Sequence, residues 1–360
     1  MRTYLTGILC IVLVMVLSPR LSYGKPPQNV LTVGPGKDFP RIEDAVKAAQ
    51  PNTEIVVYPQ SDGQPYRQTQ VLIRKSGIRI RSASARKPIV LDGTGFNYSG
   101  QGSVPRAIVQ FDSDANGGRL EGFVLQNAHN ESHNGAGIRI NQANDVVISR
   151  CLIQNNDMGI MSGGSASQKT GANQRIENCK IVRNGAPEDP GYNHNLYLGG
   201  HSVFVSRCEI ADALTGHNLK SRAHLNTVEK CFIHGAANRE IDFVDAKDGT
   251  DVPGSDSVLR NNRIVKDPNC SGNRTCIHFG QDGGNRHDGA LVLENNTIET
   301  PFQTPIVDVS DGVRVVLNNN QISDAGANAR GLVLKIRAPE SVEIKQVGNR
   351  IPKQFRIVGE

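Results

Sequence analysis

The 360-residue sequence contains no tryptophan, and its aromatic fraction is only 5%. A hydrophobic content of 38% is still enough for a folded core, which must therefore consist of Ile, Val and Leu rather than large aromatic side chains. The net charge is also small, since the sequence has 40 basic and 35 acidic residues. This balance excludes a dedicated nucleic-acid-binding protein and leaves an anionic ligand only to a local basic patch.

Long apolar runs are confined to the N-terminus. Residues 5–17 are almost entirely apolar, whereas no later stretch approaches the ~20 apolar residues that a membrane-spanning helix needs. Ser22 and Gly24 place small residues at the two positions that a signal peptidase reads. We therefore predict that residues 1–24 are a cleaved signal peptide of a secreted or periplasmic protein with no membrane span after cleavage. A retained N-terminal anchor is the alternative.

The rest of the chain repeats one short motif. Alternating aliphatic residues lead to Cys or Asn, then to one variable residue and to Ile, as in VVISRCLI and LVLENNTI. After an earlier copy with Gly122, this column recurs every 23 to 34 residues at Cys151, Cys179, Cys208, Cys231, Asn262, Asn296 and Asn320. Alternation with a period of two predicts strands, and repetition at this interval predicts a solenoid.

Stacking explains why Cys and Asn share this column. In a parallel β-coil, equivalent residues of successive turns lie about 4.8 Å apart. An inward Asn can then hydrogen-bond to its neighbours, and a buried Cys can fill the same niche. We expect the four column cysteines to be buried thiols. Cys270 and Cys276 lie outside the column in the loop CSGNRTC, and the sequence leaves open whether they form a disulfide.

A short helix is expected to cover the N-terminal end of the coil, as solubility of a solenoid requires. Its apolar face would consist of Ile42, Ala45, Val46 and Ala49. We expect one domain over residues 25–360, with a cap at about 30–58 and repeats at about 70–350. A leucine-rich repeat is the structural alternative, but it needs a Leu-dominated core and a nearly constant repeat length.

A second strand follows each column residue, as in GIRI, NLYLGG and EIDFV. Aligning these strands by their first inward aliphatic residue gives one outward column: Arg139, Met161, Tyr197, Lys220, Asp242 and His278. The same alignment places Asn195, Asn218 and Glu240 outward one position earlier, Arg222 on the same face, and His194, His217 and Arg239 at the bend. Later turns place Val307 and Val333 on this face, so polar character peaks in the middle of the solenoid.

This polar face is a candidate site for an extended polymer, because three successive turns gather its side chains within about 10 Å. Outer faces of solenoids are polar by default, however. Lys220 and Asp242 could therefore be no more than a stacked pair of opposite charges.

β-Elimination from a uronic acid polymer needs a cation at the carboxylate, a base for the α-proton and an acid for the departing oxygen. Lys220, beside the like charge of Arg222 or Arg239, is the candidate base. Either arginine would bind the carboxylate through two hydrogen bonds. The candidate proton donors are Tyr197, His217 and His278.

The other polar residues of the face are expected to bind substrate or metal. The expected substrate-binding residues are Asn195, His194, His278 and Arg139. Asn218, Glu240 and Asp242 offer oxygen atoms that would suit Ca²⁺, with Asn195 as a further oxygen ligand.

The segment LTVGPGKDFPRIEDAVKAAQPNTEIVVYP and the later N-N-x-I turns resemble the right-handed parallel β-helix superfamily of pectate lyases, over residues 30–350. The resemblance implies an all-β fold, a single-stranded right-handed parallel β-helix with a short N-terminal capping helix. This scaffold carries lyases, glycosidases, esterases, epimerases and non-catalytic adhesins, so the resemblance specifies the fold more than the activity.

Lys220 and Ser221, followed by AHLNTVEKCFI and Arg239, are similar to the Lys-Ser…Asn…Arg pattern of the chondroitinase B and alginate lyase group. That resemblance implies Lys220 as the base, Arg239 as the acid and Ca²⁺ at the carboxylate. The acidic metal ligands that the group places shortly before its Lys have no counterpart in residues 213–217.

We therefore expect an exported, monomeric lyase that acts on an acidic polysaccharide. One alternative is a glycoside hydrolase, in which Glu240 with Asp242 or Asp245 would be the acid and base. An esterase or epimerase on the same face, and a non-catalytic carbohydrate-binding or structural protein, are the others.

Overall fold

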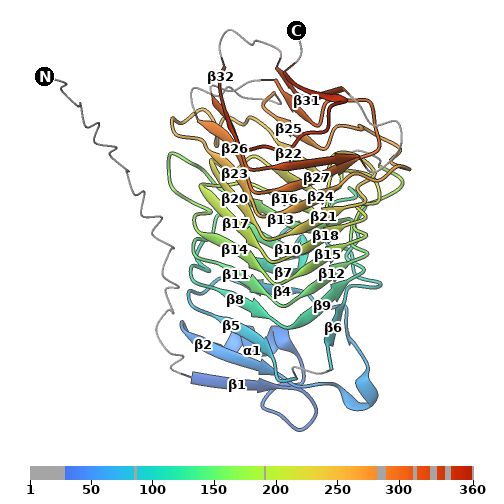
Figure 1. Ribbon diagram of the computed structural model, residues 1–360. Helices are drawn as coiled ribbons and strands as arrows, with labels where there is room; N and C mark the ends of the chain where they lie inside the picture. The colour runs from blue at the N-terminus through green and yellow to red at the C-terminus, as the bar shows by residue number, and fades with distance from the viewer. Residues whose placement is uncertain are drawn as a thin grey trace, which may run out of the picture.

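The computed structural model describes residues 29–358, apart from 85–86, 190–191, 282–288, 311–313, 325–330 and 337–341. The expected signal peptide at residues 1–24 lies outside the described residues. From Asn29 onward the chain winds into a coil of three parallel sheets, which rises from the N-terminal to the C-terminal end (Figure 1). Most turns of the coil contribute one strand to each sheet.

The first sheet has 12 strands. In order they are β1 (Asn29–Val33), β2 (Thr53–Val57), β5 (Arg79–Ser82), β8 (Arg119–Glu121), β11 (Val147–Ser149), β14 (Gln174–Glu177), β17 (Ser202–Ser206), β20 (Leu225–Glu229), β23 (Ser257–Arg260), β26 (Ala290–Glu294), β29 (Arg314–Asn318) and β32 (Glu343–Val347).

The second sheet has 10 strands. In order they are β3 (Tyr66–Arg67), β6 (Ile89–Asp92), β9 (Phe123–Gln126), β12 (Leu152–Gln154), β15 (Lys180–Val182), β18 (Glu209–Ala211), β21 (Phe232–His234), β24 (Arg263–Val265), β27 (Thr297–Thr300) and β30 (Gln321–Asp324).

The third sheet has 11 strands. In order they are β4 (Val71–Ile73), β7 (Ala107–Phe111), β10 (Ala136–Asn141), β13 (Met158–Gly163), β16 (Leu196–Leu198), β19 (Leu219–Ser221), β22 (Ile241–Phe243), β25 (Ile277–Phe279), β28 (Val307–Val309), β31 (Gly331–Ile336) and β33 (Phe355–Val358). The predicted all-β parallel coil is thereby confirmed.

The Cys/Asn column is an interior ladder, as predicted. The N–H of Cys151 donates to Sγ of Cys179 at 3.5 Å, and the N–H of Cys231 donates to Oδ1 of Asn262 at 2.9 Å. Asparagine side chains continue the ladder through Asn296 and Asn320 to Asn349. Because the ladder side chain of each turn accepts a hydrogen bond from a backbone N–H of the preceding turn, the ladder holds the register of successive turns.

All six cysteines of the described residues are free thiols. The four in the column are buried, as expected. Cys270 is partly exposed and Cys276 is buried, and they do not form the disulfide that the sequence left open.

The N-terminal end is covered by α1 (Ile42–Ala48), which packs against β1, β2 and β4 (Figure 1). Ile42, Ala45 and Val46 are its buried residues, as the apolar face predicts. A single 3₁₀ turn, η1 (Ser61–Gly63), follows β2. Within the described ranges, no helix is both long and apolar enough to cross a bilayer.

Candidate functional site

The outer face of the third sheet carries the predicted column. Tyr197 lies in register with Lys220, and Lys220 with Asp242. Their inward neighbours Leu196, Leu219 and Ile241 are stacked in the core. Towards the two ends the column continues through Arg139, Met161, His278, Asp308 and Lys335.

The expectation that Val307 and Val333 lie on this face is wrong, because both are buried in the core. Asp308 takes the outward position instead. Polar character therefore does not stop in the middle of the solenoid, and it extends along the later turns.

Asp242 is the centre of the polar cluster on this face. Its Oδ1 lies 2.8 Å from Nδ1 of His278 and 3.4 Å from Arg239, and its Oδ2 lies 3.2 Å from Nε2 of His217 and 3.9 Å from Lys220. The Asp242 side chain is only 3% exposed. Burial opposes its ionisation, but hydrogen bonds from the two histidines and the charge of Arg239 outweigh burial and hold the pKa of Asp242 well below its usual range.

His194 and His217 form a stacked pair beside this carboxylate, with ring centroids 5.0 Å apart. Burial, reinforced by neighbouring cations, lowers the pKa of His194 well below its usual value, and burial also lowers the pKa of His217. Backbone N–H groups fix the tautomers, because His217 donates to Nδ1 of His194 and Arg239 donates to Nδ1 of His217. Nε2–H of His217 therefore points at Asp242, and its ring has no lone pair left for a substrate.

Tyr197 lies among cationic and aromatic groups. The guanidinium of Arg222 is 5.4 Å from its ring centroid, Nζ of Lys220 is 6.0 Å away, and the ring of His194 meets it edge-on. These distances are those of cation–π contacts. The phenol ring is therefore held in one orientation.

A cavity of about 410 Å³ opens beside Tyr197. A Cβ on Gly249 would collide with the carbonyl oxygen of Arg222, so glycine lets the 245–249 loop pack against the backbone that directly follows β19. The charged lining side chains are Arg139, Arg222, Asp245, Lys247 and Asp248. Sequence reasoning found the first two and missed Lys247, which lies on a loop with no repeat pattern.

Asn195, Asn218 and Glu240 do not point outward, which corrects the prediction. All three are buried, and they form a second interior ladder in which Asn195 donates to Asn218 and Asn218 donates to Glu240. Each residue precedes its strand, at the bend from the second sheet, where the alternation of a strand does not apply. Asn195 therefore cannot contact a substrate on the outer face.

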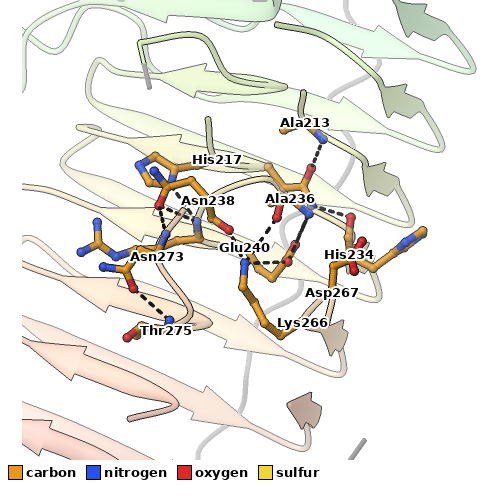
Figure 2. Close-up of polar contacts among 12 residues, drawn as sticks. Ala213, His217, His234, Ala236, Asn238, Glu240, Lys266, Asp267, Asn273 and Thr275 are labelled. Atoms are coloured by element: carbon orange, nitrogen blue, oxygen red, sulfur yellow. Dashed lines mark hydrogen bonds and ion pairs between the residues drawn. The ribbon is translucent and has the colours of Figure 1, made fainter. Parts of the chain in front are cut away.

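The second ladder ends in an ion pair, which Figure 2 shows. Nζ of Lys266 lies 3.4 Å from Oε1 of Glu240 and also contacts the carbonyl oxygens of Ala236 and Asn238. Both charged side chains are 0% exposed. Burial raises the pKa of Glu240 to about 7, against the opposing charge of Lys266 and the hydrogen bond from Asn218. Sequence reasoning missed Lys266 because nothing in its local pattern marks it as buried.

The expected Ca²⁺ ligands do not fit a calcium site. Asn218 and Glu240 face the interior, and Asp242 is surrounded by basic side chains rather than by further oxygen ligands. Among the residues that the structure describes, no group of three or more His, Cys, Asp or Glu is arranged to hold a metal ion. A glycosidase pair of Glu240 and Asp242 is also incompatible with this geometry, because one carboxyl lies inside the coil and the other outside.

Comparison with known proteins supports the fold. A family model described as "right handed beta helix region" matches residues 109–270. An alginate lyase from Paenibacillus sp. str. FPU-7 superposes with a TM-score of 0.53 at 16% identity, over 90% of this chain and 99% of that chain. A GH136 lacto-N-biosidase from Eubacterium ramulus gives a TM-score of 0.52 at 11% identity, over 92% of this chain and 68% of that chain.

A third similar structure is a DFA-IIIase from Arthrobacter chlorophenolicus A6, with a TM-score of 0.50 at 10% identity, over 91% of this chain and 96% of that chain. At these identities the likeness concerns the fold alone. No curated protein matches the sequence. The sheet topology, the family match and the similar structures together show that the chain folds as a right-handed parallel β-helix.

Proposed function

We propose that this protein is an exported polysaccharide lyase that performs β-elimination on a polymer containing uronic acid. The observation that carries the proposal is the cavity that Arg139, Tyr197 and Arg222 line, next to Lys220, which is in register with Tyr197 on the outward column. Similar folds in an alginate lyase and a lacto-N-biosidase support a carbohydrate as the class of substrate, and the first of these acts on a polysaccharide.

Arg222 is the proposed binding residue for the uronate carboxylate. It lines the cavity and lies over the ring of Tyr197. A guanidinium can hold a carboxylate through two parallel hydrogen bonds, and withdrawal of charge makes the neighbouring C–H more acidic. Arg139 lines the same cavity and is proposed to bind an adjoining sugar.

Lys220 is the proposed base and Tyr197 the proposed acid. Lys220 would take the α-proton, and the ammonium that results would be stabilised by Asp242, whose Oδ2 is 3.9 Å away. The phenol of Tyr197 would give its proton to the departing glycosidic oxygen as the C–O bond breaks and the C=C bond forms.

Arg239 and His217 are proposed as positioning residues. Arg239 contacts Asp242, and a guanidinium does not release its proton near neutral pH, so its expected acid role is replaced by an electrostatic one. His217 donates to Asp242 and keeps that carboxylate aligned with Lys220. No step of the proposed reaction passes through Ca²⁺.

The test follows ultraviolet absorbance of the unsaturated product while the protein is mixed with alginate, pectate, chondroitin or heparosan. Lys220→Ala should slow the elimination by about 10²–10⁴-fold, as loss of a general base does. Lys180→Ala is the matched control, because Lys180 is an exposed lysine of the second sheet that pairs with Glu209.

Absence of unsaturated ends with every polymer, or an unchanged rate in Lys220→Ala, would contradict the lyase proposal. New reducing ends without a C=C bond would indicate a glycosidase. Retention of a polymer on a column of immobilised protein without cleavage would indicate a carbohydrate-binding protein.

A further inference from the structure

A serine hydroxyl lies at the end of the histidine that Asp242 holds. Nε2 of His278 is 2.9 Å from Oγ of Ser310, and Nδ1 of the same ring is 2.8 Å from Oδ1 of Asp242. Both distances fall within the ~2.6–3.2 Å that joins a nucleophile to its base and the base to the group that orients it. The elimination proposed above uses neither Ser310 nor the far nitrogen of His278.

The fold fixes this alignment. Asp242 on β22 and His278 on β25 are in register, and so are His278 and Asp308 on β28. Ser310 follows Asp308 by two residues, so it lies on the same outer face, and its N–H donates to the carbonyl of Phe279 at 2.8 Å. Three successive turns therefore supply one residue each.

The hydrogen bonds also set the direction of proton transfer. An ionised Asp242 can only accept, so Nδ1 of His278 must donate to it. In the neutral ring Nε2 is then the acceptor, and it faces the hydroxyl of Ser310. The Asp242 and His278 side chains are 3% and 5% exposed, whereas Ser310 is partly exposed. Of the three residues, Ser310 is therefore the one that a substrate can reach.

We propose that Ser310, His278 and Asp242 form a nucleophilic relay that hydrolyses carboxylic esters. The expected substrate is a small acyl group on a sugar hydroxyl, and this choice of alcohol, unlike the relay itself, rests on the proposed polysaccharide function. The same polymer would then lie along one face that carries both centres.

The reaction balances without a further reagent. Oγ of Ser310 bonds to the acyl carbon while its proton passes to Nε2 of His278. The ester C–O bond then breaks, the sugar oxygen takes that proton, and the acyl group stays on Ser310. Water attacks the acyl-serine, gives a proton to His278 and releases the carboxylic acid, and the proton returns to Ser310.

The first test uses the intact protein and a fluorophosphonate probe, with the labelled residue identified by peptide mass mapping. Labelling should map to Ser310 in the folded protein and disappear after heat denaturation. Ser310→Ala should abolish it, and His278→Gln should slow it by at least about 100-fold, as loss of a general base does. Ser167→Ala is the matched control, because Ser167 is an exposed serine whose hydroxyl contacts Ser165 rather than an imidazole.

The second test measures hydrolysis of p-nitrophenyl acetate and release of acetate from O-acetylated alginate and pectin. Both should be lost in Ser310→Ala, with thermal melting used to show that the variant folds. Absence of labelling at Ser310, or ester hydrolysis that persists in Ser310→Ala, would overturn the proposal and reduce the contact to a structural hydrogen bond.

The two proposals fail separately. The elimination assay uses de-esterified polymers, so it reports on the lyase alone. The probe and p-nitrophenyl acetate need no polymer, so they report on Ser310 even where no polymer is cleaved.

Discussion

Glu240 and Lys266 place two opposite charges inside an otherwise apolar and amide-lined coil. Both side chains are fully buried, and Glu240 also accepts hydrogen bonds from Asn218 and from the N–H of Ala236. A buried ion pair contributes little net stability, because desolvation offsets the attraction, but removal of one partner leaves an uncompensated charge. The pair therefore matters more for keeping the second ladder in one arrangement than for stabilising the fold.

A double-mutant cycle at pH 8 tests this view. Glu240→Gln and Lys266→Met should each lower the free energy of unfolding by about 3–5 kcal/mol, while the double variant should be about as stable as the original protein. Chemical denaturation followed by circular dichroism measures all four proteins. Additive losses in the double variant would show that the two side chains do not act as a pair.

The same pair should be visible in the pH dependence of stability. The pKa of Glu240 rises from 4.5 to about 7 on folding, so the folded state binds the proton more tightly than the unfolded state. The resulting stabilisation is complete below pH 4.5 and is lost as the pH rises through 7. Relative to the double variant, the original protein should therefore lose stability over this range.

Strand alternation predicts which residues point outward within a strand, but not at the bends between strands. Tyr197, Lys220 and Asp242 could be placed on one face because each lies within a strand between two inward aliphatic residues. Asn195 and Glu240 could not, because they precede their strands at a bend. Near Val307 two adjacent aliphatic residues are both buried, so the first inward residue was ambiguous, and a slip of one residue moves every side chain to the other face.

The cysteine ladder is an element that chemical modification can test. Cys270 is partly exposed, whereas the other five described cysteines are buried. Burial raises the pKa of Cys276 to about 12 and that of Cys151 well above its usual value, which disfavours the reactive thiolate. Iodoacetamide should therefore modify Cys270 in the native protein and the other five only after unfolding.

Peptide mass mapping without reductant measures the outcome. Rapid native modification of Cys179 or Cys208 would contradict the ladder. Failure of Cys270 and Cys276 to react in denaturant would instead reveal a disulfide between them.

At the scale of the whole molecule, the repeat predicted the coil, but it could not predict what the loops enclose. The cavity beside Tyr197 depends on the contact of Gly249 with Arg222 and on residues 162–164 from an earlier turn. His278 and Ser310 lie 32 residues apart in the chain. Their contact depends on the length of the intervening turn, and turn lengths in this coil do not follow the repeat.

The N-terminal cap protects the end of the whole coil. A solenoid end exposes the core of its last turn together with unpaired strand edges, which promotes aggregation unless a cap covers them. Ile42 is the first residue of α1 and is only 1% exposed, so Ile42→Asp would bury a charge without a partner. We expect this variant to melt at a lower temperature and to aggregate at concentrations where the original protein stays dispersed.

Lys47→Ala is the control on the exposed side of the helix, and thermal melting with light scattering measures both variants. Equal behaviour of the two variants would mean that α1 is not needed to close the coil.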